Sequence, residues 1–160
     1  MYICNFKLNL KKIFIIIITI ALVIALIFEI SSMSKKENKR SYDYTLTNEN
    51  FTYVLRDVHN NIEDNIGKTI KLSGFVFRLP DFKQGYFVCG RNMLLDDDAK
   101  IVGFLCKYEG ELNLNDAEWV EVTGIFEKGY YMTDMPVIKI DTINKITAPV
   151  NTYVETPDFL

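Results

Sequence analysis

The chain has 160 residues, of which 49% are apolar and 13% aromatic, enough for one domain of roughly 100 residues beyond an apolar N-terminus. Three cysteines and one histidine are too few for a disulfide scaffold or a typical zinc site. Residues 1–40 carry a charge balance of +5 and residues 41–160 a balance of −8. Because the acidic part would repel a phosphate backbone, we expect no nucleic-acid partner.

Residues 13–30 form the most apolar stretch and predict a transmembrane helix. They contain one charge, Glu29, and are just long enough to cross a bilayer core of about 30 Å. A cleaved signal peptide is the alternative, although the run exceeds a usual signal-peptide core and Ser32-Met33-Ser34 is a mediocre cleavage pattern. Residues 1–12 form a short basic tail whose Lys11 and Lys12 abut the run. We therefore favour a single-pass protein of the cell membrane with an extracytoplasmic domain.

Residues 31–46 and 47–66 lead from the membrane segment to the domain. Residues 31–46 are polar and aperiodic and predict a linker, whose basic cluster either contacts lipid headgroups or is simply solvated.

Residues 47–66 predict one amphipathic helix, capped by Thr47 or Asn48 and ended by Gly67. Its apolar residues recur at spacings of three and four: Phe51, Val54, Leu55, Val58 and Ile62. The single histidine, His59, lies beside this stripe without a second ligand nearby, so we interpret it as a boundary residue.

Residues 67–148 predict a five-stranded barrel, and residues 149–160 a C-terminal tail. The expected strands cover residues 69–79, 86–95, 99–108, 119–127 and 136–146. Gly74 lies within the first, where a long strand can bend across both halves of a barrel. A short helical turn, capped by Asn115 or Asp116, is expected before the fourth. This order favours a mainly β, OB-like fold, while a five-stranded sandwich or an SH3-like barrel would show similar local patterns.

A family resemblance rests on motifs spread through this barrel. They are Gly67-Lys68-Thr69-Ile70-Lys71-Leu72-Ser73-Gly74-Phe75-Val76-Phe77-Arg78, Asp81-Phe82, Phe87-Val88, Arg91, Asp98-Ala99, Val102-Gly103 and Trp119-Val120-Glu121-Val122-Thr123-Gly124. With them, the chain resembles the YcgQ-type proteins over residues 45–149. The resemblance implies a membrane-anchored bacterial subunit of a two-component permease with an OB-like C-terminal half. Family members carry more than one membrane span, and many carry a Cys-Cys pair between the positions of Arg91 and Asp98. This chain has one predicted span and no such pair, so the resemblance implies no ligand.

Cys89 and Cys106 are the best candidates for thiol chemistry. If the second and third strands turn between Asp97 and Asp98, the two cysteines face each other and are within disulfide reach. An extracytoplasmic location permits a disulfide. The alternative is a pair of buried thiols that pack as small apolar side chains.

A candidate binding face comprises Phe75, Phe77, Arg78, Arg91 and Asp98. Three tyrosines, Tyr86, Tyr130 and Tyr131, extend its aromatic surface, of the kind with which OB barrels stack ligands. Filling of the core is the alternative role for most of these rings.

The run from Asp96 to Asp98 either binds a hard cation such as Ca²⁺ or forms a solvated turn, and we favour the turn.

The sequence contains no nucleophile with a suitably spaced base, so we expect neither an enzyme nor a cofactor. The leading hypothesis is a membrane-anchored, non-catalytic accessory subunit. Its expected partners are the lipid bilayer and a polytopic membrane protein. The alternative is an independent extracytoplasmic module that binds a saccharide, a peptide or an ion.

Overall fold

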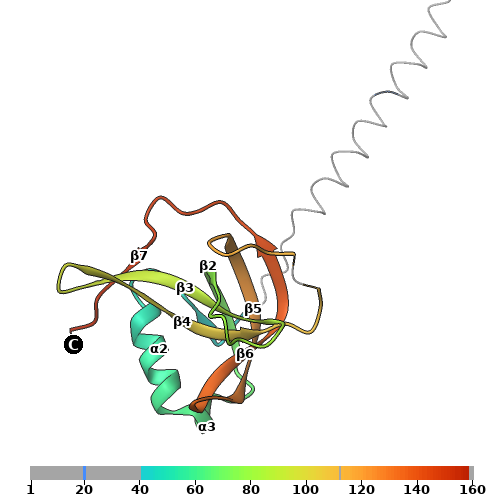
Figure 1. Ribbon diagram of the computed structural model, residues 1–160, viewed down its shortest axis with the longest axis horizontal. Helices are drawn as coiled ribbons and strands as arrows, with labels where there is room; N and C mark the ends of the chain where they lie inside the picture. Colours follow the sequence, from blue (N-terminus) through green and yellow to red (C-terminus); the bar gives the residue numbers. More distant parts are fainter. Residues whose placement is uncertain (1–19, 21–40, 112, 159–160) are drawn as a thin grey trace, which may run out of the picture. The chain divides into compact units, whose positions relative to one another are not determined.

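The computed structural model describes Ile20 and residues 41–111 and 113–158 (Figure 1). The chain divides into two units, residues 1–41 and 42–160, and every element named below belongs to the second. Apart from Ile20, the predicted transmembrane helix over residues 13–30 lies outside the described residues, as does most of the predicted linker. Within the part that is described, no helix combines the length and apolarity needed to cross a membrane.

Five strands close into a barrel, as the sequence predicted, and the described chain is mainly β. They are β2 (Thr69–Phe77), β3 (Tyr86–Leu95), β4 (Asp98–Lys107), β5 (Trp119–Tyr131) and β6 (Thr133–Lys145). Around the barrel the order is β2, β5, β6, β4 and β3, and β3 then pairs with β2. The β4–β6 pairing is parallel and the other four are antiparallel. Three strands, a connection and a hairpin thus follow the predicted OB-like order.

Strand β2 serves both halves of the barrel by bending at Gly74. Its residues 69–75 pair with β5, whereas residues 75–77 pair with β3. A Cβ atom added at Gly74 would lie 2.5 Å from the carbonyl oxygen of Gly90, too close for any other residue without a backbone shift. β2 thus changes its pairing partner next to this glycine, at Phe75, where the sequence predicted a bend.

The β3–β4 hairpin has a different register from the one predicted. Asp96 and Asp97 have φ values of 49° and 66° and form a two-residue turn, so Leu95 pairs with Asp98. Cys89 therefore lies opposite Phe104 rather than opposite Cys106. The predicted register is wrong because each of the three consecutive aspartates tolerates the left-handed conformation, so the sequence allows two turn positions, and the turn forms at the earlier one.

The predicted helix over residues 47–66 is shorter and is interrupted. The structure has α2 (Phe51–Asn60) and α3 (Ile62–Asn65), separated at Asn61, whose ψ of 52° is not helical. Neither Thr47 nor Asn48 caps α2. Instead the backbone N–H of Thr47 donates to Oδ1 of Asn50, 2.7 Å away, so the residues before Phe51 form a turn.

Helix α2 closes one end of the barrel core. Its Phe51 is buried and lies edge-on to Phe104 of β4, with ring centroids 6.1 Å apart. Phe104 in turn meets Phe126 of β5 at 5.6 Å. The helical turn predicted before β5 is absent from the described residues of that connection, which contain only a turn at Asp116-Ala117. The N-terminal helix, rather than an internal one, therefore completes the core.

Two segments predicted as linker and tail are part of the domain. Strand β1 (Tyr44–Thr45) pairs in parallel with β2, and β7 (Tyr153–Val154) pairs in parallel with β3. The domain thus extends beyond residues 67–148 at both ends. Two-residue strands are too short to produce a detectable alternation of apolar and polar residues, which explains why the sequence pattern missed them.

Candidate functional site

A cavity of about 210 Å³ lies between the β2–β3 connection (residues 78–85) and the β5–β6 hairpin. We call it the loop hollow. OB barrels commonly bind their ligands between the two loops at these positions. Its walls combine aromatic rings with side chains of both charges: Asp81, Phe82, Lys83, Tyr86, Lys107, Glu127, Lys128, Tyr130 and Tyr131. The hollow therefore offers stacking surfaces and hydrogen-bonding groups in one small space.

The two loops that bound the hollow are joined to each other. The hydroxyl of Tyr131 donates to Oδ2 of Asp81 at 2.8 Å, and this bond to the carboxylate raises the pKa of Tyr131. The rings of Phe82 and Tyr131 also meet edge to face, with centroids 5.3 Å apart and planes at 88°. The walls of the hollow are therefore formed before any ligand arrives.

The β5–β6 hairpin is anchored at Lys128, four residues before its tip, and is exposed at the tip itself. Lys128 Nζ lies 2.7 Å from a carboxylate oxygen of Glu63 in α3 and 3.2 Å from one of Asp134. These bonds raise the pKa of Lys128, with Glu63 as the main cause. At the tip, Tyr130 is 75% exposed and Met132 is 79% exposed. The φ of Met132 is 60°, a left-handed value uncommon for a residue with a side chain. The chain thus holds two large side chains out toward solvent.

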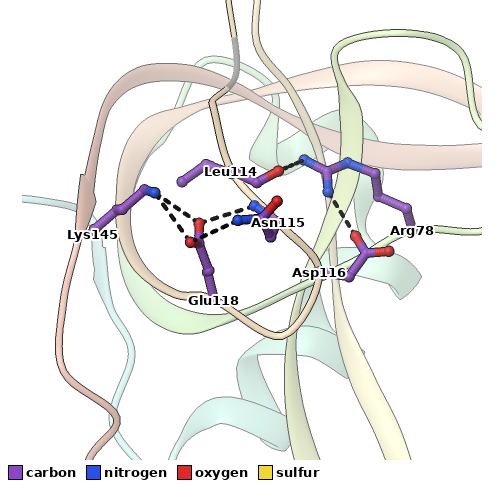
Figure 2. Close-up of polar contacts among 6 residues, drawn as sticks. All are labelled: Arg78, Leu114, Asn115, Asp116, Glu118 and Lys145. Atoms are coloured by element: carbon purple, nitrogen blue, oxygen red, sulfur yellow. Dashed lines mark hydrogen bonds and ion pairs between the residues drawn. The ribbon is translucent and has the colours of Figure 1, made fainter.

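A second cavity of about 290 Å³ adjoins the loop hollow and shares Phe82, Lys83 and Tyr86 with it. Arg78 lines this second cavity. Its guanidinium donates to Asp116 at 2.6 Å and to the carbonyl oxygen of Leu114 at 3.1 Å (Figure 2). Arg78 therefore ties the end of β2 to the β4–β5 connection.

Glu118 organises the same connection (Figure 2). Its carboxylate accepts the backbone N–H of Asn115 at 2.9 Å and the side-chain amide of Asn115 at 3.1 Å. Lys145 Nζ lies 3.0 Å away. These bonds lower the pKa of Glu118, the backbone N–H of Asn115 being the largest cause.

We expect Glu118→Gln to reduce stability at pH 7, and the deficit to shrink at acid pH. A carboxyl group whose pKa is lowered in the folded state stabilises that state above its unfolded value of about 4.5, and this contribution disappears as the pH falls through the lower folded value. Urea unfolding of both proteins across this range measures the difference. Glu111→Gln is the control, because the structure shows no polar partner for Glu111 among the described residues. A deficit that stays constant with pH would contradict the prediction.

The predicted binding face does not form one surface. Phe75 lies edge-on to Trp119 at 5.9 Å, and Phe77 is half-buried at the end of β2. Asp98 is exposed beside the β3–β4 turn, 3.3 Å from Lys100. Arg78 reaches the second cavity, as described above. Phe75 and Arg91 both lie against Trp119, whereas Arg78 and Asp98 lie in other parts of the domain.

Tyr86, Tyr130 and Tyr131 do come together, at the loop hollow. Sequence reasoning missed Asp81 and Phe82 as their neighbours. The signal was present, because Pro80-Asp81 ends the first strand and Gly129 marks the later hairpin, and these are the two loops with which an OB barrel binds.

Arg91 is buried, with 4% of its surface exposed, and joins three segments of the chain. Its guanidinium donates to Oδ1 of Asn48 and to the carbonyl oxygens of Ser73, Asn151 and Thr152, the last three at 3.3–3.4 Å. It also lies 5.2 Å from the ring centroid of Trp119. Burial lowers the pKa of Arg91. Because neutral acceptors of the chain itself occupy the donors of this guanidinium, we interpret Arg91 as a structural residue.

Cys89 and Cys106 are both buried free thiols. They occupy diagonal positions across the β3–β4 pair, where Cα atoms are about 7–8 Å apart, beyond the usual span of a disulfide. Burial raises the pKa of Cys106 to about 12 and raises the pKa of Cys89 well above its ordinary value.

We expect neither thiol to react with iodoacetamide at pH 8 in the folded protein, and both to react after unfolding. A thiol with a pKa of about 12 is ionised in only about one molecule in ten thousand at that pH, and burial excludes the reagent as well. Mass spectrometry of a Cys4→Ser chain counts the modified sites. If the unmodified protein instead had a mass lower by two hydrogen atoms than its sequence requires, and reduction restored that mass, the two cysteines would form a disulfide.

His59 packs between α2 and the barrel. Its Nδ1 lies 2.7 Å from the carbonyl oxygen of Leu55, and its ring centroid is 6.0 Å from that of Phe104. The structure places this histidine at the boundary between helix and core, as the sequence predicted.

Comparisons with known proteins give one family match and a few related chains. A family model described as the DUF1980 C-terminal domain matches residues 29–155. The UPF0703 protein YcgQ of Bacillus subtilis (strain 168) is 25% identical over 126 residues, which cover 76% of this chain and 42% of that protein. This chain thus spans less than half the length of that relative. Among solved structures, a small single-stranded DNA-binding protein from Streptomyces coelicolor aligns with 51% of this chain and 95% of its own, with a TM-score of 0.35 and 13% identity. A likeness at that score supports no conclusion about the ligand.

Proposed function

The chain belongs to the DUF1980 C-terminal domain family, and from this premise we propose that it is a non-catalytic accessory subunit that binds a polytopic protein in a membrane complex. Its YcgQ-type character, shown by the same matches, agrees with the resemblance found in the sequence. The binding surface in this proposal is the loop hollow together with the exposed tip of the β5–β6 hairpin.

The exposed tip is the observation that carries the proposal. Tyr130 and Met132 each expose about three-quarters of their surface, although burial of such side chains is favourable. The hairpin beneath them is fixed by Lys128 and by the bond from Tyr131 to Asp81. Rigid, exposed aromatic and methionine side chains beside a small pocket are typical of the centre of a protein interface.

Affinity purification of the tagged full-length chain from detergent-solubilised membranes tests the proposed partner. We expect the wild-type chain to recover a polytopic membrane protein, and a Tyr130→Ser, Met132→Ser chain to lose most of it. Tyr153→Ser is the matched control, because Tyr153 is also exposed but lies in β7. Recovery of the wild-type chain alone, or equal recovery by the tip variant, would overturn the proposal.

The membrane location is a second part of the proposal. It rests on the sequence of residues 13–30, with one charge at its far end, and on the basic residues that precede it. We propose that the domain lies outside the cytoplasm. Protease treatment should therefore remove it in intact spheroplasts and spare it in inverted vesicles, and the opposite pattern would reverse the topology.

An independent extracytoplasmic binding module is the second candidate, and the lining of the loop hollow favours it. A cavity of about 210 Å³ with tyrosine rings, lysines and carboxylates suits a small polar ligand such as one sugar ring. In that case the chain would purify alone, and Tyr86→Ala would weaken ligand binding without changing any association with another protein.

A further inference from the structure

One edge of β4 is open along most of its length. On one side β4 pairs with β3 over all of residues 98–107. On the other side it pairs with β6 only through residues 105–107. Within the described chain, residues 98–103 therefore present an edge that no strand covers, while the next residue, Phe104, is fully buried. Such an edge offers unpaired backbone N–H and C=O groups to an incoming strand.

An apolar groove runs between this edge and helix α2. Its volume is about 490 Å³. The walls are formed from α2 and from the β3–β4 hairpin, and include Leu55, His59, Met93, Ile101, Val102 and Pro157. Ile101 is 46% exposed. An added strand would thus find a place for its apolar side chains beside the backbone that it pairs with.

The same hairpin already accepts a strand on its opposite edge. There β7 pairs in parallel with Asn92 and Met93 of β3. Strand β1 is added to β2 in the same way. The fold therefore uses short added strands at two edges, while the β4 edge beside the groove carries none in the described chain.

The charge at the end of the open edge indicates which strand would fit. Asp96, Asp97 and Asp98 are all exposed, and Lys100 is close to Asp98 only. A second copy of the unpaired part of this edge would bring Lys100 as its one cation, together with the three aspartates at and before its start, which leaves the acidic turns uncompensated.

We propose that the β4 edge takes up an extended segment of a partner protein as an added strand, with apolar side chains in the groove and basic side chains over the acidic turn. This mode gives affinity through backbone hydrogen bonds and specificity through the side chains at alternate positions. The surface is distinct from the loop hollow, so it stands independently of the function proposed above.

The probe is a short peptide of alternating valine and threonine with two lysines at one end, compared with a peptide whose lysines are glutamates. With the full-length chain in detergent, the lysine peptide should bind at least about tenfold more tightly by fluorescence polarisation. Hydrogen exchange at residues 99–103 should slow when it binds. An absence of binding, or slowing confined to other strands, would overturn the proposal.

Substitutions in and around the β4 edge test where the lysine peptide binds. Ile101→Lys should abolish it, whereas Leu94→Lys, an exposed residue of β3 in the same hairpin, should not. Asp96→Asn with Asp97→Asn should remove the preference for lysine and keep the turn, because asparagine tolerates the left-handed conformation. Tyr130→Ser should leave binding unchanged. A chain that sediments as a dimer, with residues 99–103 protected before peptide is added, would show that a second copy occupies the edge.

Discussion

Phe104→Ala should destabilise the domain by about 3–5 kcal/mol, the usual cost of deleting a fully buried phenylalanine ring. The ring has no exposed surface and meets three rings from two elements: Phe51 of α2 at 6.1 Å, His59 of α2 at 6.0 Å and Phe126 of β5 at 5.6 Å. Its loss leaves a cavity where the helix meets the barrel. Since small domains have a total stability of about 5–15 kcal/mol, the variant should lose a large part of it.

Urea unfolding of the full-length chain measures this loss, and hydrogen exchange shows where it occurs. Protection should fall most in α2, residues 51–60, because the ring of Phe104 in β4 contacts both Phe51 and His59 of this helix. Tyr130→Ala is the control and should change stability by no more than about 0.5 kcal/mol, since Tyr130 is 75% exposed. A loss below about 1 kcal/mol for Phe104→Ala would mean that the helix does not close the barrel.

The barrel could be predicted from the sequence because its signals are local. Alternation of apolar and polar residues located β3 at residues 86–95, as the structure has it. Gly74 marked the bend in β2 because only glycine allows the approach to Gly90. Each signal depends on a few adjacent residues, so no knowledge of the rest of the chain was needed.

The register and the site could not be predicted in the same way. Three consecutive aspartates allow the β3–β4 turn at more than one position, and the choice decides which residues face Cys89. Asp81 and Tyr131 are fifty residues apart in sequence and meet only when the two loops fold toward each other. Arg91 looked like a surface cation, because its acceptors lie in segments that the sequence assigned to a helix, a strand and a tail.

Arg91→Met should destabilise the domain by about 2–4 kcal/mol and loosen its C-terminal segment. Removing a buried charge regains its desolvation cost, which by itself would favour methionine. Against this, the change removes the hydrogen bonds from the guanidinium to half-buried Asn48, Ser73 and Thr152 and to exposed Asn151, and a hydrogen bond that involves a charged group contributes about 1.5–3 kcal/mol. Because methionine fills much of the same volume, the loss should come from these acceptors rather than from a cavity.

Arg91→Lys distinguishes the effect of the positive charge on stability from the effect of the shape of the guanidinium. A lysine keeps the charge, but its single ammonium group cannot reach acceptors in three segments at once, and it would also lose contact with the ring of Trp119. We therefore expect Arg91→Lys to be at least as destabilising as Arg91→Met.

Urea unfolding gives both losses, and hydrogen exchange at residues 151–155 should rise in both variants, since the guanidinium holds Asn151 and Thr152 beside β3. Ser73→Ala is the control: it deletes only a hydroxyl 3.4 Å from Arg91 and should cost less than about 1 kcal/mol. If Arg91→Met proved more stable than the wild-type chain, the desolvation of the buried guanidinium would outweigh all its hydrogen bonds, and Arg91 would have to be kept for a reason other than folding.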